Sequence, residues 1–303
     1  MRFMERMDFG PVPVAALGEM LWDMLPGGRR PGGAPANFAC HMAAFGCESW
    51  LVSAVGHDEV GDELTRFFAA KGVNLSVSRV ERPTGRVEVA LDEAGVPRYE
   101  IVSDVAWDHI PFTEREAALA RRVRCACFGT LAQRSPVSRR TIDRFLDSMP
   151  GDALRVFDIN LRASCQERSV VEQSLVRCNV LKMNDEELPE VCALFGREPS
   201  DSESDCRRLM ADFDIGWVIL TGGARESAIF TPEGVSRRDT PSVVVADTVG
   251  AGDSFTAAFC AGLLRGLSLR EIHRLAVDTA AFVCGSEGAT PSLPKRLTDR
   301  LAG

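Results

Sequence analysis

The feature that most restricts the fold is an alternation of short apolar runs with segments of helical period or length, which fills the chain after residue 125. Buried strands are predicted at 125–129, 155–160, 180–184 and 217–221. Strands that alternate with helices in this way form a parallel sheet with helices on both faces. We therefore predict an α/β fold built on a doubly wound, mostly parallel sheet.

The first quarter of the chain has the same pattern. An apolar run before a glycine predicts a buried strand at 12–20, and a stretch with an early proline and a final glycine predicts a helix at 34–46. The remaining expected elements are a strand at 50–55, a helix at 62–71, a hairpin at 225–245 and closing helices at 254–264 and 269–284.

Residues 84–104 break this pattern. Apolar and polar residues alternate there with period two around Glu93-Ala-Gly95, which is typical of a hairpin with one wet face. A hairpin of that kind does not suit a buried parallel sheet. We therefore predict a small β lid formed by 84–104 together with residues near 22–31, inserted into a single domain that spans 1–303.

Composition excludes several classes of protein. The net charge of -8 and the scattered basic pairs provide no cationic surface for nucleic acid. No apolar stretch approaches the eighteen residues of a membrane span, and the charged start, Met1–Arg6, is unlike a secretory signal. The ten cysteines lie singly, apart from Cys125-x-Cys127, which suits buried thiols in a reducing compartment. We expect a cytoplasmic protein.

The strongest functional signal is the string Asp247-Thr-Val-Gly-Ala-Gly-Asp-Ser-Phe255. Gly250, Ala251 and Gly252 are small enough to let backbone N–H groups converge at a helix start, where an anion is favoured. Asp253 falls in the first turn, placed to accept a proton from a hydroxyl. Taken alone, the string could equally be a tight turn with Asp253 as a helix cap.

Further strings accompany it. They are Gly32-Gly-Ala-Pro-Ala-Asn-Phe-Ala39, Gly18-Glu-Met-Leu-Trp-Asp23, Asp158-Ile-Asn-Leu-Arg162, Asn184-x-x-Glu187 and Thr221-Gly-Gly223. In this order, over almost the whole chain, the set resembles the PfkB, or ribokinase-like, carbohydrate kinases. Glu226 departs from the pattern, because that position is usually glycine in the family. A P-loop kinase in its usual form and a Rossmann dehydrogenase lack support, since neither glycine-rich signature occurs.

The resemblance implies roles for these residues. Asp253 would be the catalytic base, with Gly250, Ala251 and Gly252 as the anion hole. The implied sugar ligands are Asp23, Gly33, Asn37 and Arg162. The implied cofactors are ATP and Mg²⁺, with Asn160, Asn184, Thr221, Gly223 and Gly252 on the nucleotide side, Glu187 organising Mg²⁺ through waters, and Asp247 contributing to a K⁺ site.

Substrate choice is less restricted. The segments 83–108 and 128–134 look most like bacterial fructokinases, which favours fructose. Kinases of 2-keto-3-deoxygluconate, ribose or nucleosides stay open, and Arg98 or Arg162 could pair with a sugar carboxylate. A non-catalytic sugar or nucleotide sensor is the alternative from another class. Lid edges pair between subunits in many relatives, so the resemblance is compatible with a homodimer.

Overall fold

The computed structural model describes residues 10–25, 27–91, 97–162, 167–198 and 200–301. In these residues the main sheet has nine strands in the order β13-β12-β11-β10-β9-β8-β1-β4-β5. The strands from β11 to β5 run parallel, and β12 and β13 add an antiparallel hairpin at one edge. Their bounds are β1 Pro13–Leu17, β4 Glu48–Gly56, β5 Asn74–Val80, β8 Cys125–Phe128, β9 Leu154–Asp158, β10 Val180–Asn184, β11 Trp217–Thr221, β12 Glu226–Thr231 and β13 Gly234–Asp239.

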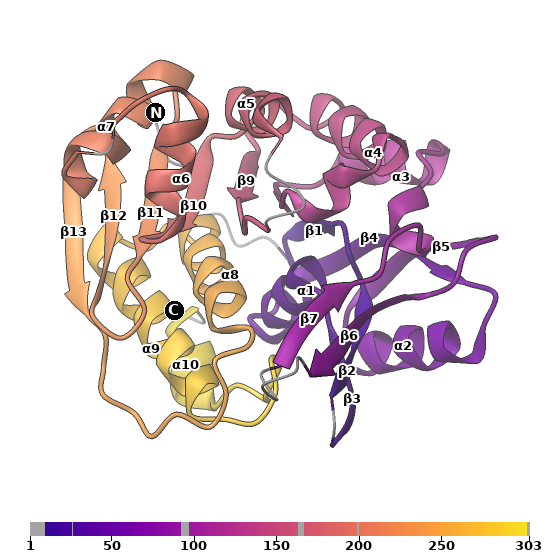
Figure 1. The fold of residues 1–303 in the computed structure, drawn as a ribbon. Helices are drawn as coiled ribbons and strands as arrows, with labels where there is room; N and C mark the ends of the chain where they lie inside the picture. Colours follow the sequence, from indigo (N-terminus) through magenta and orange to yellow (C-terminus); the bar gives the residue numbers. More distant parts are fainter. Residues whose placement is uncertain (1–9, 26, 92–96, 163–166, 199, 302–303) are drawn as a thin grey trace.

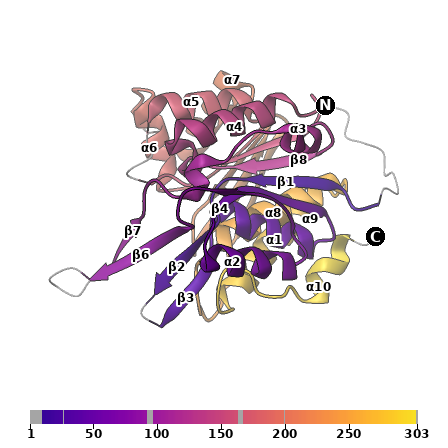
Figure 2. The same cartoon turned by 90° about the vertical axis from the view of Figure 1, so that its right-hand side faces the viewer.

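Helices cover both faces of this sheet (Figures 1 and 2). One layer contains α1 (Ala34–Ala44), α2 (Glu59–Ala70), α8 (Ala251–Leu264), α9 (Leu269–Cys284) and the short α10 (Lys295–Thr298). The other contains α3 (Glu114–Ala120), α4 (Pro136–Asp147), α5 (Arg168–Arg177), α6 (Glu187–Leu194) and α7 (Ser202–Phe213). Successive residues of β1 enter opposite cores, because Val14 packs with the first layer and Ala15 with the second. The predicted doubly wound sheet is confirmed.

The lid sheet is separate from the main sheet. It pairs β3 (Gly28–Gly32), β2 (Leu21–Leu25), β6 (Gly85–Leu91) and β7 (Pro97–Ile101) in that order. Figure 2 shows these strands extending away from the helical layers. The period-two pattern therefore identified a small β sheet outside the main core, as predicted, and β3 and β7 are its edges.

The strand order reverses next to β1. From β1 the chain moves outward through β4 to β5, then returns to the other side of β1 with β8 and continues to β11. In open α/β sheets, ligands bind beyond the carboxyl ends of the strands at such a switch point. Gly18 and Glu19 follow β1, while Gly129 and Thr130 follow β8, so these residues lie at the switch point.

Two predicted boundaries were displaced by glycine. The first strand was expected to reach residue 20, but β1 ends at Leu17 because Gly18 has a φ of 140° that interrupts the extended backbone. The helix expected from 254 begins three residues earlier, at Ala251, because the glycine-rich string forms its first turn.

Two expectations from composition can be compared with the structure. The nine cysteines among the described residues carry free thiols, and all but Cys284 are buried. Within the same residues, every helix is too short or too polar to cross a membrane. The first ten residues lack a periodic pattern, which predicts a loose tail, but all of them except Gly10 lie outside the described residues.

Candidate active site

The first turn of α8 has the geometry of an anion site. Its N-cap, Gly250, adopts a left-handed backbone with φ 78°, and no side chain caps the helix. A β-carbon at Gly250 would lie 2.6 Å from the Ala289 carbonyl oxygen, so both backbone angle and space require glycine. The N–H groups of a helix's first turn have no partner within the helix, and its dipole favours negative charge there. The predicted anion hole at Gly250, Ala251 and Gly252 therefore has suitable geometry.

Asp253 lies in this same turn and is partly buried. Asn37 Nδ2, from α1, donates to Asp253 Oδ2 at 2.9 Å, which joins residues 216 positions apart. Burial, reinforced by the Asp158 carboxylate, raises the pKa of Asp253 to about 6. Asn37, Lys182 and Arg162 oppose that rise. An aspartate with this pKa is ionised near neutral pH yet is a stronger base than an exposed one.

Gly33 fixes the entry to α1. It is the N-cap of that helix with φ 112°, and a β-carbon there would lie 2.4 Å from the Glu19 carbonyl oxygen. Any larger residue would push α1, and with it Asn37, away from α8. The side chain of Asn37 is buried, and none of the described residues donates a hydrogen bond to its Oδ1 atom. The structure thus leaves Asn37 an acceptor for a ligand hydroxyl.

Asp23 approaches the site from the lid. It lies on β2 opposite Arg30 of β3, and burial together with the Asp247 carboxylate raises its pKa. Arg30 Nη1 donates to Asp247 Oδ2 at 3.0 Å, so the lid contacts the loop that precedes α8. Asp247 also accepts from the Val249 N–H, at 3.0 Å. The lid and the glycine-rich string are therefore linked directly.

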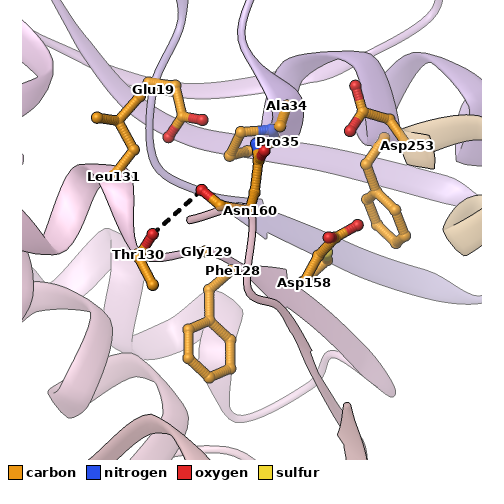
Figure 3. A pocket seen from close by; sticks show the side chains of 12 residues that line it. Glu19, Ala34, Pro35, Phe128, Gly129, Thr130, Leu131, Asp158, Asn160 and Asp253 are labelled. Atoms are coloured by element: carbon orange, nitrogen blue, oxygen red, sulfur yellow. Dashed lines mark hydrogen bonds between the residues drawn. The ribbon is translucent and has the colours of Figure 1, made fainter. Parts of the chain in front are cut away.

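The predicted nucleotide side lies at the ends of β9, β10 and β11. Glu187 is buried, and its two carboxylate oxygens accept from the N–H groups of Leu161 and Asn184, each at 2.8 Å. Asn184 Oδ1 accepts from the N–H groups of Glu186 and Glu187 at the start of α6. These contacts join the carboxyl ends of β9 and β10. Asn160 follows β9 with φ 43° and lines the pocket shown in Figure 3.

Thr221 ends β11, and Gly223 continues the turn into β12 with φ 59°. The turn is closed by hydrogen bonds from the Gly222 N–H to the Glu226 carbonyl and from the Arg225 N–H to the Gly222 carbonyl. Glu226 is the first residue of β12, opposite Asp239, so its backbone is extended and does not need glycine. Arg162 is exposed and donates to its neighbour, the Leu161 carbonyl, at 3.1 Å.

Metal binding by protein side chains alone has no support in the described residues, where no three His, Cys, Asp or Glu side chains cluster as ligands. Glu187, the predicted Mg²⁺ residue, already uses both oxygens on backbone groups. Each oxygen keeps a second lone pair, which fits contact through water with an ion that retains much of its hydration shell. The donor set is compatible with Mg²⁺ held mainly by phosphate and water.

The sequence analysis missed Lys182. This residue lies inside β10 and is 7% exposed, and its Nζ contacts Asp158 Oδ1 at 3.0 Å. Thr256 Oγ1, from α8, donates to the other Asp158 oxygen at 2.9 Å. A β-carbon on Gly252 would lie 3.1 Å from Lys182 Nζ, so the ammonium group lies directly behind the anion hole. The available signal was a lysine within an apolar strand, which is rarely buried without a partner.

Glu19 was also missed. It follows β1 at the switch point and is 3% exposed, and its Oε2 atom has no hydrogen-bond partner in the part of the chain that the structure describes. It lines the same pocket as Asp253, Asp158 and Asn160. An acid directly after a buried parallel strand was the signal that could have identified it.

Comparison with known proteins identifies the family. Residues 27–296 match the pfkB family of carbohydrate kinases. The chain therefore belongs to the PfkB family of carbohydrate kinases. It is accordingly a phosphotransferase that acts on an alcohol group.

Individual relatives agree in length and fold. The chain is 28% identical to a fructokinase of Klebsiella pneumoniae over 298 residues, covering 92% of this chain and 95% of the relative. The uncharacterized sugar kinase PH1459 of Pyrococcus horikoshii, solved with ATP, has a TM-score of 0.78 and 27% identity, covering 93% and 95%. A double-mutant fructokinase of Vibrio cholerae O395, solved with fructose, ADP and potassium, has a TM-score of 0.78 and 22% identity, covering 97% and 99%. This kinase thus shares the family fold over almost all of its length.

Proposed function

We propose that this kinase transfers the γ-phosphoryl group of MgATP to the primary hydroxyl of a small sugar, with D-fructose giving fructose 6-phosphate as the first candidate. The observation that carries the proposal is the position of Asp253 beside the uncapped first turn of α8, where Asn37 holds its carboxylate. A base and an anion site lie there within one helical turn. Phosphoryl transfer needs this combination, since its catalysis rests on positioning and electrostatics.

On the acceptor side, Asp253 takes the proton of the attacking hydroxyl. Asp23, Gly33, Asn37 and Arg162 hold the sugar, and closure of the lid excludes water that would otherwise compete as the nucleophile. The contact between Arg30 and Asp247 supports a lid that closes over this turn, because it joins the lid sheet to the string that contains Asp253.

On the nucleotide side, MgATP supplies the phosphoryl group and the Mg²⁺ charge when it is bound. The N–H groups around Gly250, Ala251 and Gly252 stabilise negative charge at the phosphoryl group. Asn160, Asn184, Thr221 and Gly223 line the nucleotide side, and Glu187 orients Mg²⁺ through water. Asp247 contributes to a K⁺ site in the adjacent loop, a role supported by the potassium in the Vibrio cholerae structure.

Fructose is favoured by the resemblance of this kinase to the Klebsiella pneumoniae fructokinase. A second candidate is 2-keto-3-deoxygluconate, since Arg162 is exposed beside the pocket and could pair with its carboxylate. Arg98 is the other cation considered for that carboxylate. Its side chain is outside the described part of the structure.

The test is ADP release from MgATP with fructose, ribose, 2-keto-3-deoxygluconate, glucose and adenosine. We expect one acceptor to dominate, and Asp253→Ala to lower its kcat by about 10²- to 10⁴-fold, the usual contribution of a general base. Asp205→Asn, at a buried aspartate on α7, is the matched control and should keep turnover. Full turnover by Asp253→Ala would contradict the mechanism, and silence of the wild-type kinase with the whole panel would contradict the substrate class.

A further inference from the structure

Glu19 is a buried acid that the reaction described above does not use. It lies at the topological switch point, between the carboxyl ends of β1 and β8. In Figure 3 its carboxylate and that of Asp253 lie on either side of Ala34 and Pro35, in one pocket. The position therefore belongs to the ligand-binding edge of the sheet rather than to the packed core.

One oxygen of the Glu19 carboxylate lacks a hydrogen-bond donor among the described residues, which indicates a place for a ligand. Backbone N–H groups of Glu19 itself and of Ala34 favour the charged carboxylate, but Oε2 has no partner among the described residues although Glu19 is 3% exposed. A buried acceptor without a donor is energetically costly, so such atoms are rare unless a bound molecule completes them. Burial, with a contribution from the Asp253 carboxylate, raises the pKa of Glu19 to about 7.

The same pocket region holds further acceptors. Asn37 Oδ1 is also buried without a partner, because the amide nitrogen of Asn37 is the atom that binds Asp253. Asp253 and Asp158 add negative charge to the lining. Of the two cations that act on this region, Lys182 is already paired with Asp158, and Arg162 is exposed at the margin. This lining favours a ligand that donates hydrogen bonds and disfavours a sugar that carries a negative charge.

We propose that Glu19 determines acceptor specificity: its unpartnered carboxyl oxygen accepts a hydrogen bond from a sugar hydroxyl other than the one phosphorylated, and its charge selects neutral polyhydroxyl sugars over carboxylated or phosphorylated ones. The inference rests on the proposed sugar kinase activity and sharpens it. It favours fructose over 2-keto-3-deoxygluconate on the basis of charge.

The hydrogen bond between Glu19 and a sugar hydroxyl is tested by removing each partner separately and both together. kcat/KM is measured for wild type and Glu19→Ala with fructose and with its 1-deoxy, 3-deoxy and 4-deoxy analogues. For one analogue we expect a loss of about 10- to 100-fold in wild type, as for a hydrogen bond to a charged group, and little further loss in Glu19→Ala. Equal losses in both proteins for every analogue would overturn the contact.

A second variant tests the charge and guards against misfolding. Glu19→Gln keeps the size of the side chain, and we expect the ratio of kcat/KM for 2-keto-3-deoxygluconate over fructose to rise at least about tenfold. The matched control is Glu116→Gln, which removes the charge of an equally buried glutamate that is bonded to Ser76 on the far side of the sheet. Its ratio should stay at the wild-type value.

The outcomes separate the two proposals. An unchanged ratio in Glu19→Gln, together with wild-type turnover of a sugar, would overturn the role of Glu19 and leave the kinase reaction standing. That result would make Glu19 a structural support for the Gly33 turn. Absence of turnover by wild type with every sugar would overturn the kinase proposal, and with it the role of Glu19.

Discussion

Two ion pairs lie beside the first turn of α8, and they have the same separation but different surroundings. Lys182 Nζ and Asp158 Oδ1 are 3.0 Å apart, with 9% of each side chain exposed. Arg30 Nη1 and Asp247 Oδ2 are also 3.0 Å apart, with 50% and 18% exposed. The first pair joins neighbouring strands of the main sheet, whereas the second joins the lid to a loop. Equal distances therefore describe two unlike interactions.

The difference lies in what each pair can do during a catalytic cycle. Separating a buried pair leaves an uncompensated charge in a medium of low polarity, so Lys182 and Asp158 stay together. Their charges therefore keep fixed positions beside the first turn of α8. An exposed pair is solvated when it opens, so Arg30 and Asp247 can separate at little cost, as the proposed opening and closure of the lid requires. Although burial disfavours its charge, the carboxylates of Asp158 and Glu187 raise the pKa of Lys182 above its usual value, which keeps the ammonium charged behind the anion hole.

The largest effect should follow from breaking the buried pair. We expect Lys182→Met to lower the free energy of unfolding by about 3–5 kcal/mol, because Asp158 is left buried without its cation. Urea denaturation followed by circular dichroism measures this loss. The double variant Lys182→Met/Asp158→Asn should recover much of it, since no charge is then stranded. A loss below about 1 kcal/mol in the single variant would mean that the buried and exposed pairs are equivalent.

The sequence was sufficient for the architecture because the relevant signals are local. Alternating apolar runs predicted the parallel sheet, and the period-two pattern at 84–104 predicted the lid sheet. Predicted boundaries of strands and helices were wrong where a glycine could belong either to a loop or to the end of the element. Gly250, Ala251 and Gly252 were expected at a helix start, but the helix itself was predicted from 254, whereas α8 begins at Ala251 with Gly250 as a left-handed N-cap.

The candidate site was predicted only in part, because some of its residues are defined by contacts between distant elements. Asp253 and Asn37 belong to strings that can be recognised in the chain, and the structure brings them within 2.9 Å. Lys182 belongs to no string, and Glu19 lies in the string Gly18–Asp23, in which only Asp23 was given a role. Their significance depends on Asp158, on the strand next to that of Lys182, and on the switch point between β1 and β8, which only the folded topology shows.

Asp253 is the intermediate case in the comparison, a partly buried carboxylate that forms no ion pair with any of the described residues. Its pKa of about 6 in the folded protein exceeds the ordinary aspartate pKa of 3.8, so the folded state binds the proton more tightly. Stability should then fall as pH rises from about 4 to 6 and stay lower above that range.

Asp253→Asn removes this ionisation. Because the residue is partly exposed, we expect the variant to be only about 1–2 kcal/mol more stable than wild type at pH 7.5, with little difference at pH 4. Urea denaturation at both pH values measures this, and an equal difference at both would contradict the raised pKa.

The smallest effect on stability should follow from breaking the exposed pair. Arg30→Gln should change the free energy of unfolding by less than about 1 kcal/mol, because both partners are solvated once they separate. It should instead raise the KM for the sugar severalfold at low salt, since the lid loses a contact that holds it over α8. That increase should shrink at high salt, where the wild-type pair is itself screened.

Steady-state kinetics at two ionic strengths measure the effect, with Arg29→Gln, on the same strand, as the matched control. If the KM of Arg30→Gln equalled that of wild type at low salt, this pair would be a surface contact without a part in lid closure.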